Sequence, residues 1–235
     1  PGEQNSNVMK TTMRVVLMAI PVALGQTGKV NAQDNLSLGP SAGFGHTWLS
    51  NSTNAGYQPA GNLGLCLVYS PLTHWGFGAD LKWSIEGGKT SGNNNTVRTR
   101  LDYIRIPVKA YYFFGEYGQR LRPKVALGPS IGFLVGGTRE VETIDGDVKH
   151  ITKTRAKEVA NSVDVGIAAA AGFNYRLVER TWLNLDLNYY NGFSDVNKNV
   201  NVEQRNRNIG INVGVTFGIG KVTEDGATIR KPDVR

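Results

Sequence analysis

The sequence predicts an all-β fold, an eight-stranded antiparallel up-and-down β-barrel, and three observations lead to it. From residue 36 onward, apolar and polar residues alternate with a period of two, and no segment shows convincing helical periodicity. The connections between the alternating segments are long and short in turn. Charged residues make up 19% of the chain, below the roughly 25% of an ordinary soluble domain.

The strands and their connections follow from this alternation. An even strand number, with short turns at one end and long loops at the other, is typical of outer-membrane barrels. Long polar connections are expected near 50–60, 88–96, 140–160 and 194–206, and short ones near 71–74, 115–122 and 177–180. The expected strands are 36–49, 61–70, 75–87, 97–114, 123–139, 161–176, 181–193 and 207–219.

The two faces of each strand distinguish a membrane barrel from a soluble one. In the strand at 75–87, Phe77, Leu81 and Trp83 lie opposite Asp80 and Lys82. The polar face of the strand at 207–219 is mostly glycine, asparagine and threonine, which suits a crowded lumen better than a water-exposed exterior. We therefore expect a transmembrane β-barrel with its apolar face in lipid. A secreted lipocalin-like small-molecule binder, with the apolar face inside, is the alternative.

Aromatic spacing agrees with a membrane barrel. Trp75 and Trp83 are eight residues apart, and so are Trp182 and Tyr190. At about 3.4 Å per residue and a tilt near 40°, eight residues climb roughly 21 Å, close to the apolar band of about 25 Å in such barrels. These four residues are predicted to belong to the two aromatic girdles.

The N-terminal residues 1–32 are expected to be an upstream extension plus a cleavable signal peptide. Lys10 and Arg14 precede an apolar stretch at 15–25, and residues 30–32 offer small side chains for cleavage. The apolar stretch is about half of the roughly 20 residues that a membrane-spanning helix needs. The chain is then expected to reach the cell outer membrane, with the barrel at 33–220 and a polar periplasmic tail at 221–235.

Motifs that suggest chemistry lack their structural context. Residues 39–43 and 128–132 match G-x-S-x-G, but both lie inside strand patterns, whereas a nucleophile elbow needs a strand, a turn and a helix. Gly88-Lys89-Thr90 has no preceding P-loop glycine. The three histidines and Cys66 have no metal-ligand spacing. No catalytic residue, cofactor or metal is predicted, and scattered basic residues give no nucleic-acid site.

Charged residues on the inner face of two neighbouring strands form the first candidate site. Charges in a narrow lumen must be paired, so we predict a salt-bridge network there. Eight strands leave an interior just wide enough for side chains, which favours a polar plug over a gated or ion-selective path. The predicted network consists of Asp80, Lys82, Glu86, Arg105 and Lys109.

The longest connection, residues 139–157, is the second candidate site. Asp145-Gly146 lies between two alternating segments and is a type I′ hairpin signal, which predicts a hairpin that continues beyond the membrane. Its basic residues could pair with lipid phosphates or with a protein partner, and a merely solvated hairpin is the other interpretation. The residues concerned are Arg139, Lys149, Lys153, Arg155 and Lys157.

Two motifs carry a family resemblance. The segments Leu101–Gly115 and Arg122–Phe133 resemble the Tyr-x-x-Ile-Pro and Pro-x-x-x-x-Gly-Pro-x-x-Gly strands of the PorT-like outer-membrane β-barrel family. The resemblance implies a small outer-membrane barrel of a Gram-negative cell without catalytic residues, and the founding member of that family is tied to type IX secretion.

The expected role combines these predictions. We expect a monomeric, non-enzymatic barrel with a structural, adhesive or secretion-accessory role, in contact with outer-membrane lipid and lipopolysaccharide and with other envelope or secretion proteins. A narrow porin-like channel is the alternative function.

Overall fold

The computed structural model of the chain describes residues 36–52, 54–116, 118–146, 148–199 and 203–219. The predictions for residues 1–32 and for the tail at 221–235 lie outside these ranges. Among the described residues, no helix is long and apolar enough to cross a membrane. The elements are β1 (Leu36–Leu49), β2 (Ala55–Gly56), β3 (Pro59–Tyr69), β4 (Trp75–Ser91), β5 (Asn95–Phe113), β6 (Leu121–Asp145), β7 (Val148–Arg155), α2 (Ala156–Val159), β8 (Val163–Val178), β9 (Thr181–Gly192) and β10 (Asn206–Ile219).

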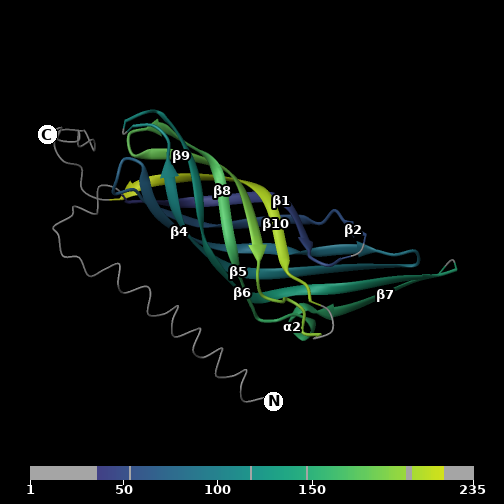
Figure 1. Ribbon diagram of the computed structural model, residues 1–235. Helices are drawn as coiled ribbons and strands as arrows, with labels where there is room; N and C mark the ends of the chain where they lie inside the picture. The colour runs from purple at the N-terminus through teal and green to yellow at the C-terminus, as the bar shows by residue number, and fades with distance from the viewer. Residues whose placement is uncertain (1–35, 53, 117, 147, 200–202, 220–235) are drawn as a thin grey trace, which may run out of the picture. The chain divides into compact units, whose positions relative to one another are not determined.

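Eight of these strands close into an antiparallel barrel, which confirms the predicted fold class (Figure 1). The order around the barrel is β4-β3-β1-β10-β9-β8-β6-β5, and pairing between β5 and β4 completes the circle. The first and last strands pair with each other, with Leu36 opposite Ile219. Closure leaves no exposed sheet edge inside the membrane, where an unpaired backbone group has no water to bind.

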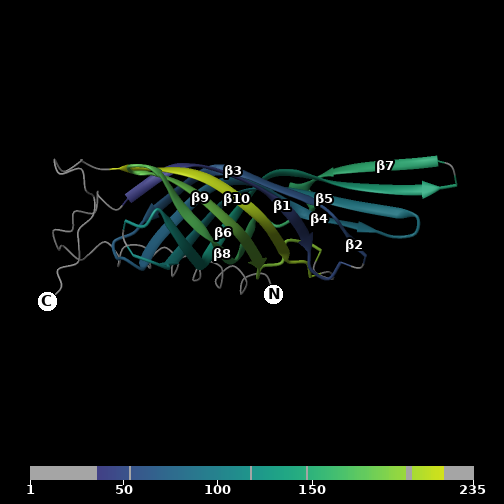
Figure 2. The same cartoon turned by 90° about the horizontal axis from the view of Figure 1, so that it is seen from above.

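The four strands β4 to β7 run past the rest of the barrel at the end that carries the long connections (Figure 2). We call this end the loop end and the opposite end the turn end. The part of these strands that lies beyond the barrel is called the extension here and consists of residues 87–91, 95–100, 138–145 and 148–155.

Two predicted connections are wrong in detail at the extension. Most of the loop expected at 88–96 is strand, because β4 continues to Ser91 and β5 begins at Asn95. The predicted hairpin is present, with Asp145 opposite Val148 and Gly146 at a φ of 59° in the turn. Its second strand does not continue into the barrel, because α2 separates β7 from β8. In the extension, β5 and β6 each pair with a strand on both sides, so their backbone N–H and C=O groups are hydrogen-bonded. The polar sequence of this region does not reveal that pairing.

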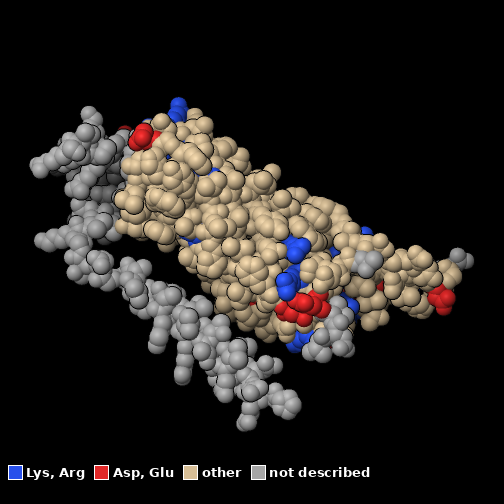
Figure 3. All heavy atoms as spheres, viewed as in Figure 1, with Lys and Arg blue, Asp and Glu red and all other residues tan. Residues whose placement is uncertain are grey.

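The outer face of the barrel is apolar. Exposed side chains on it include Phe44, Leu63 and Ile211, with exposed fractions of 66%, 60% and 56%. Figure 3 shows few charged groups between the two ends of the barrel on the face in view. An apolar exterior of this size is typical of a surface that lies against lipid, and it argues against the lipocalin-like alternative.

Aromatic clusters mark both ends of the apolar band. At the turn end, the ring centroid of Tyr112 lies 5.2 Å from that of Trp75 and 5.1 Å from that of Phe114. At the loop end, the His46 ring stacks at 5.3 Å on Trp48 and at 5.1 Å on Tyr57. These rings occupy the positions that aromatic girdles take in membrane barrels.

The girdle prediction is wrong for the pair on β9. Tyr190 is only 3% exposed and faces the lumen, while its neighbour Tyr189 lies on the outer face. Trp182 shares the inner face because it pairs with the buried Thr216. Spacing of eight residues gives the right height, but the strand's period of two decides which face a ring occupies.

Candidate functional site: the barrel interior and the extension

A buried ion network lies inside the barrel near the loop end. Arg105 on β5 binds Glu86 on β4 through two bonds, Nε to Oε1 and Nη2 to Oε2, both of 2.6 Å. Its Nη2 also donates at 2.7 Å to Asp164 Oδ2 on β8, which is separated from β5 by β6 alone. The Tyr190 ring centroid lies 3.9 Å from the Arg105 Cζ. Because an arginine fork matches a carboxylate, one guanidinium binds both buried carboxylates directly.

Neutral groups complete the hydrogen bonding of the two carboxylates. Ser84 Oγ donates to Glu86 Oε1 at 2.7 Å, and Ser194 Oγ donates to Asp164 Oδ1 at 2.9 Å. Asn206 Nδ2 donates to Glu86 Oε2. Buried charges are tolerated only when their remaining lone pairs find donors, and here each carboxylate has at least one neutral donor as well as the arginine.

A second network lies nearer the turn end. Asp80 Oδ2 accepts from Lys109 Nζ at 2.9 Å and from Lys82 Nζ at 3.3 Å. Lys124 Nζ on β6 lies 3.0 Å from Asp186 Oδ2 on β9. The five residues that the sequence analysis singled out thus lie in the lumen, divided between two networks instead of one.

Three further charged residues belong to these networks and were not predicted from the sequence: Asp164, Lys124 and Asp186. Each occupies an inner position of an alternating strand, so the period-two pattern could have placed it in the lumen. No sequence pattern shows which of these charges meet across the lumen, because that depends on the stagger of strands that are not neighbours.

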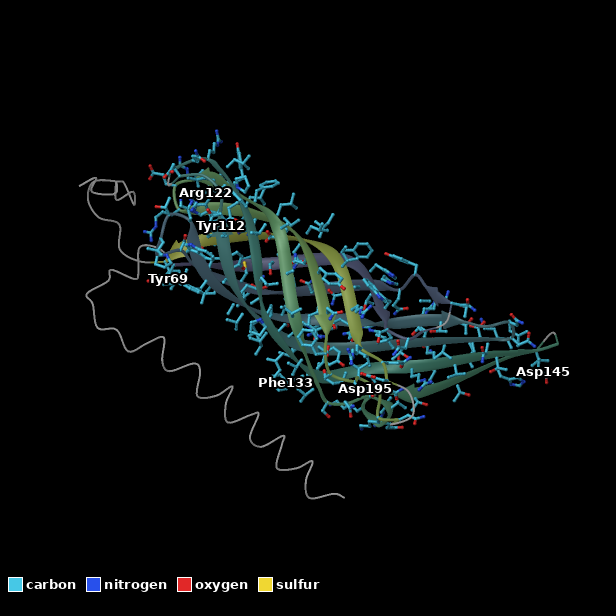
Figure 4. All side chains as sticks on the ribbon, viewed as in Figure 1. Tyr69, Tyr112, Arg122, Phe133, Asp145 and Asp195 are labelled. Atoms are coloured by element: carbon cyan, nitrogen blue, oxygen red, sulfur yellow. The ribbon has the colours of Figure 1, made fainter. Side chains whose placement is uncertain are left out.

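Apolar clusters lie on both sides of the polar layer. At the loop end, buried side chains of the barrel pack with α2 and with the segment after β9: Leu49, Leu101, Tyr103, Leu134, Ala156, Ala160 and Val196. At the turn end, the buried cluster is Val68, Tyr111, Phe113, Ala126 and Ala170. Figure 4 labels Tyr112 and Arg122 near the turn end, Phe133 and Asp195 near the loop end, and Asp145 at the tip of the extension. The lumen is therefore filled with side chains along its length.

The space left inside the barrel is small. Two cavities with volumes of about 50 and 20 Å³ border the ion networks. A buried water needs about 10–15 Å³ by this measure, so these two cavities have room for a few water molecules. No group of three or more potential metal ligands occurs among the described residues.

The basic residues predicted at the hairpin do not form one surface. On the outer face of the extension, Lys149 pairs with Glu142 at 2.8 Å and Lys153 with Glu140 at 2.7 Å. The hydrogen bond from Lys153 lowers the pKa of the Glu140 carboxyl below its ordinary value. Arg155 is exposed on the same face.

The other two predicted residues lie elsewhere. Arg139 lies opposite Thr99 and Thr154, on the other face of the extension. Lys157 belongs to α2, and its carbonyl accepts a hydrogen bond from Lys198 Nζ. Two of the five predicted residues thus lie away from the outer face of the extension.

A closed eight-stranded barrel with an apolar exterior and a filled polar lumen defines the class of small outer-membrane β-barrel proteins. Residues 31–198, more than half of the chain, match the family described as outer membrane protein beta-barrel domain, and the chain belongs to this family. Membership places the protein in the outer membrane.

Several solved structures are similar to this chain at low identity. Neisserial surface protein A is 14% identical, with 78% of this chain and 97% of that chain covered and a TM-score of 0.45. Outer Membrane Protein W of E. coli is 13% identical, with 79% and 97% covered and a TM-score of 0.47. Ail, the attachment invasion locus protein of Yersinia pestis, is 12% identical, with 77% and 98% covered and a TM-score of 0.40. No curated protein matches the sequence.

Proposed function

We propose that the protein is a non-conducting, non-enzymatic and monomeric outer-membrane barrel that holds the extension outside the cell for contact with another envelope or secretion protein. The observation that carries this proposal is the free edge of the extension. Within the described residues, β7 pairs with β6 alone, so alternate backbone groups of Val148–Arg155 have no strand partner. An exposed strand edge is a template for pairing with a further strand.

Exposed apolar side chains support contact with a protein at this edge. Val148 is 55% exposed, Ile151 is 52% exposed, and Ile144 on the adjacent strand is 46% exposed. These apolar groups lie at a strand tip far from lipid. A partner that removes them from water lowers the free energy of the complex. A narrow porin-like channel needs an open path through the lumen. Side chains fill this lumen, which favours the anchoring role.

Family subgroup and export route belong to the same proposal. The motifs that resemble the PorT-like family form most of β5 and the first part of β6, two of the four strands that continue into the extension. We propose that the chain is PorT-like and that residues 1–32 contain its export signal.

Site-specific photo-crosslinking in cells tests the proposal. A photoreactive amino acid replaces Ile151 at the free edge in one variant and Val213 on the apolar outer face in the matched control. The expected result is one discrete crosslinked protein from the Ile151 position and none from the Val213 position. Each variant is run on a gel with and without heating, and a heat-dependent change in mobility shows that it forms a closed barrel.

Two results would overturn the proposal. The first is the absence of any protein adduct from Ile151, Val148 and Ile144 under conditions in which the barrel is folded in the outer membrane. The second is solute flux through the wild-type barrel that equals the flux of a general porin, which would favour the channel.

A further inference from the structure

The outer face of the extension carries a group of basic side chains at its base. Lys89 on β4 lies directly opposite Arg98 on β5. Arg100 lies opposite Thr138, and Thr138 lies opposite Arg155 on β7. Side chains opposite one another in antiparallel strands point to the same face, so Lys89, Arg98, Arg100 and Arg155 share one surface, here called the basic face.

The basic face continues the lipid-facing surface of the barrel. Arg98 and Arg100 have the same parity along β5 as the half-exposed Val108 in the apolar band, and Lys89 has that of the half-exposed Leu81 on β4. Arg100 lies four residues beyond Ile104, the last apolar side chain on this face of β5. Four residues of a tilted strand climb roughly 10 Å, which is the level of the lipid headgroups above the hydrocarbon.

Three of the four cations have no ion pair within the described residues. Arg100 Nε pairs with Asp102 Oδ1 at 2.9 Å, but Lys89, Arg98 and Arg155 have no carboxylate within 4.0 Å. Glu140 lies directly opposite Arg98, but its carboxylate forms its ion pair with Lys153, so Arg98 acts on Glu140 only through a longer-range electrostatic attraction. Like charges directly opposite each other on two strands are destabilising, and an anion held between Lys89 and Arg98 removes that cost.

We propose that the basic face binds the phosphate groups of the phosphorylated glycolipid of the outer leaflet. The arginine forks match phosphate oxygens in pairs, and the surface stands at the height where those phosphates lie. Lipid is favoured over a soluble protein because the same strands present the apolar band directly below. The site goes beyond the proposed protein contact, which uses the edge of β7, and it orients the extension relative to the membrane.

Binding of lipid A by the full-length, folded chain in detergent micelles tests the proposal. Native mass spectrometry measures the affinity for diphosphoryl lipid A and for the same lipid after removal of its phosphates. The test variant is Lys89→Gln/Arg98→Gln/Arg155→Gln. The matched control, Arg139→Gln/Lys149→Gln/Lys198→Gln, removes the same charge from the opposite face of the extension, its tip and the segment after β9. A heat-dependent gel shift shows that both variants are folded.

The expected result is a clear preference of the wild type for the phosphorylated lipid. Each cation near a phosphate layer raises the affinity about fivefold. The test variant lacks three such cations and should therefore bind diphosphoryl lipid A about a hundredfold more weakly. The control should stay within about twofold of the wild type, since its cations do not line the basic face.

Several outcomes would overturn the inference. They are equal affinity of the test variant and the wild type, an equal loss in the control, equal binding of the dephosphorylated lipid, and displacement of lipid A by an equal concentration of inorganic phosphate. The crosslinking at Ile151 is measured separately, so failure of the protein contact and failure of the lipid site are distinguishable.

Discussion

Arg105 shows how a single residue organises the lumen. Its side chain is 3% exposed and joins carboxylates from β4 and β8, two strands that are not neighbours in the barrel. Burial of a charge costs several kcal/mol, and only close pairing with hydrogen-bonded partners offsets it. The network therefore contributes less to net stability than to selecting one arrangement of side chains inside the barrel.

Replacement of Arg105 should be strongly destabilising for this reason. Arg105→Met leaves Glu86 and Asp164 buried without a counterion, and we expect a loss of about 3–5 kcal/mol in the free energy of unfolding. Urea unfolding in phospholipid vesicles, followed by tryptophan fluorescence, measures the change. The control Arg100→Met removes an exposed arginine and should cost no more than about 1 kcal/mol. Equal losses in the two variants would show that leaving Glu86 and Asp164 without their counterion carries no extra cost.

The β6 strand shows how one irregular element directs the extension. Asp102 pairs with Gly136 and Tyr103 with Leu134, so Val135 is an extra residue on β6 and forms a bulge. Close to it, Gly137 has a φ of 120°, and a Cβ there would lie 2.2 Å from the Arg100 carbonyl oxygen. Beyond the bulge, the even-numbered residues of β6 face outward, which brings its glutamates to the face that carries the β7 lysines.

The pairing of Glu140 with Lys153 makes the hairpin sensitive to acid. Because the pKa of Glu140 is lowered in the folded hairpin, its stabilising effect is present above the ordinary pKa of 4.5 and is lost as the pH falls through the lowered value. Amide hydrogen exchange of β7, corrected for the intrinsic pH dependence, should therefore accelerate in this acidic range. The variant Lys153→Gln should show a smaller step, because only the electrostatic effect of Arg98 still lowers the pKa of Glu140. A step of unchanged size in that variant would assign the acid sensitivity to another group.

At the scale of the whole molecule, an apolar cluster fills the lumen toward each end of the barrel. One apolar cluster lies at the loop end, where Leu101 and Tyr103 pack against α2, and the other lies at the turn end around Tyr111 and Phe113. The ion networks occupy the space between them. An eight-stranded barrel is just wide enough for its side chains, and here large side chains fill that width.

Solute flux should be negligible for this reason. Liposomes that contain the wild-type barrel should swell in sugar solutions no faster than protein-free liposomes, with a general porin as the positive control. The variant Leu101→Ala/Leu134→Ala weakens the cluster at the loop end and should remain closed, because the turn-end cluster and both networks are intact. Flux through this variant alone would show that the loop-end cluster is the only effective seal.

Much of the fold was predictable because alternation in a strand is a local property. Phe77, Leu81 and Trp83 face outward on β4, opposite Asp80 and Lys82, as their pattern predicts. In the extension, the hairpin of β6 and β7 was predictable from the Asp145-Gly146 signal. The pairing of β4 with β5, which places Lys89 opposite Arg98, was not, because the sequence there resembles a polar loop. Strand length there depends on neighbouring strands, which supply the hydrogen bonds.

The sequence by itself determined the strand number, the face of most side chains and the position of the hairpin turn, since each depends on residues close together in the chain. Only the tertiary structure decided which lumenal charges meet, that Tyr190 covers Arg105, and that the bulge in β6 places acids and bases on one outer face. The physical reason is the stagger of the closed sheet. It brings residues such as Arg105 and Asp164 together from strands that do not pair with each other, and no local pattern encodes that meeting.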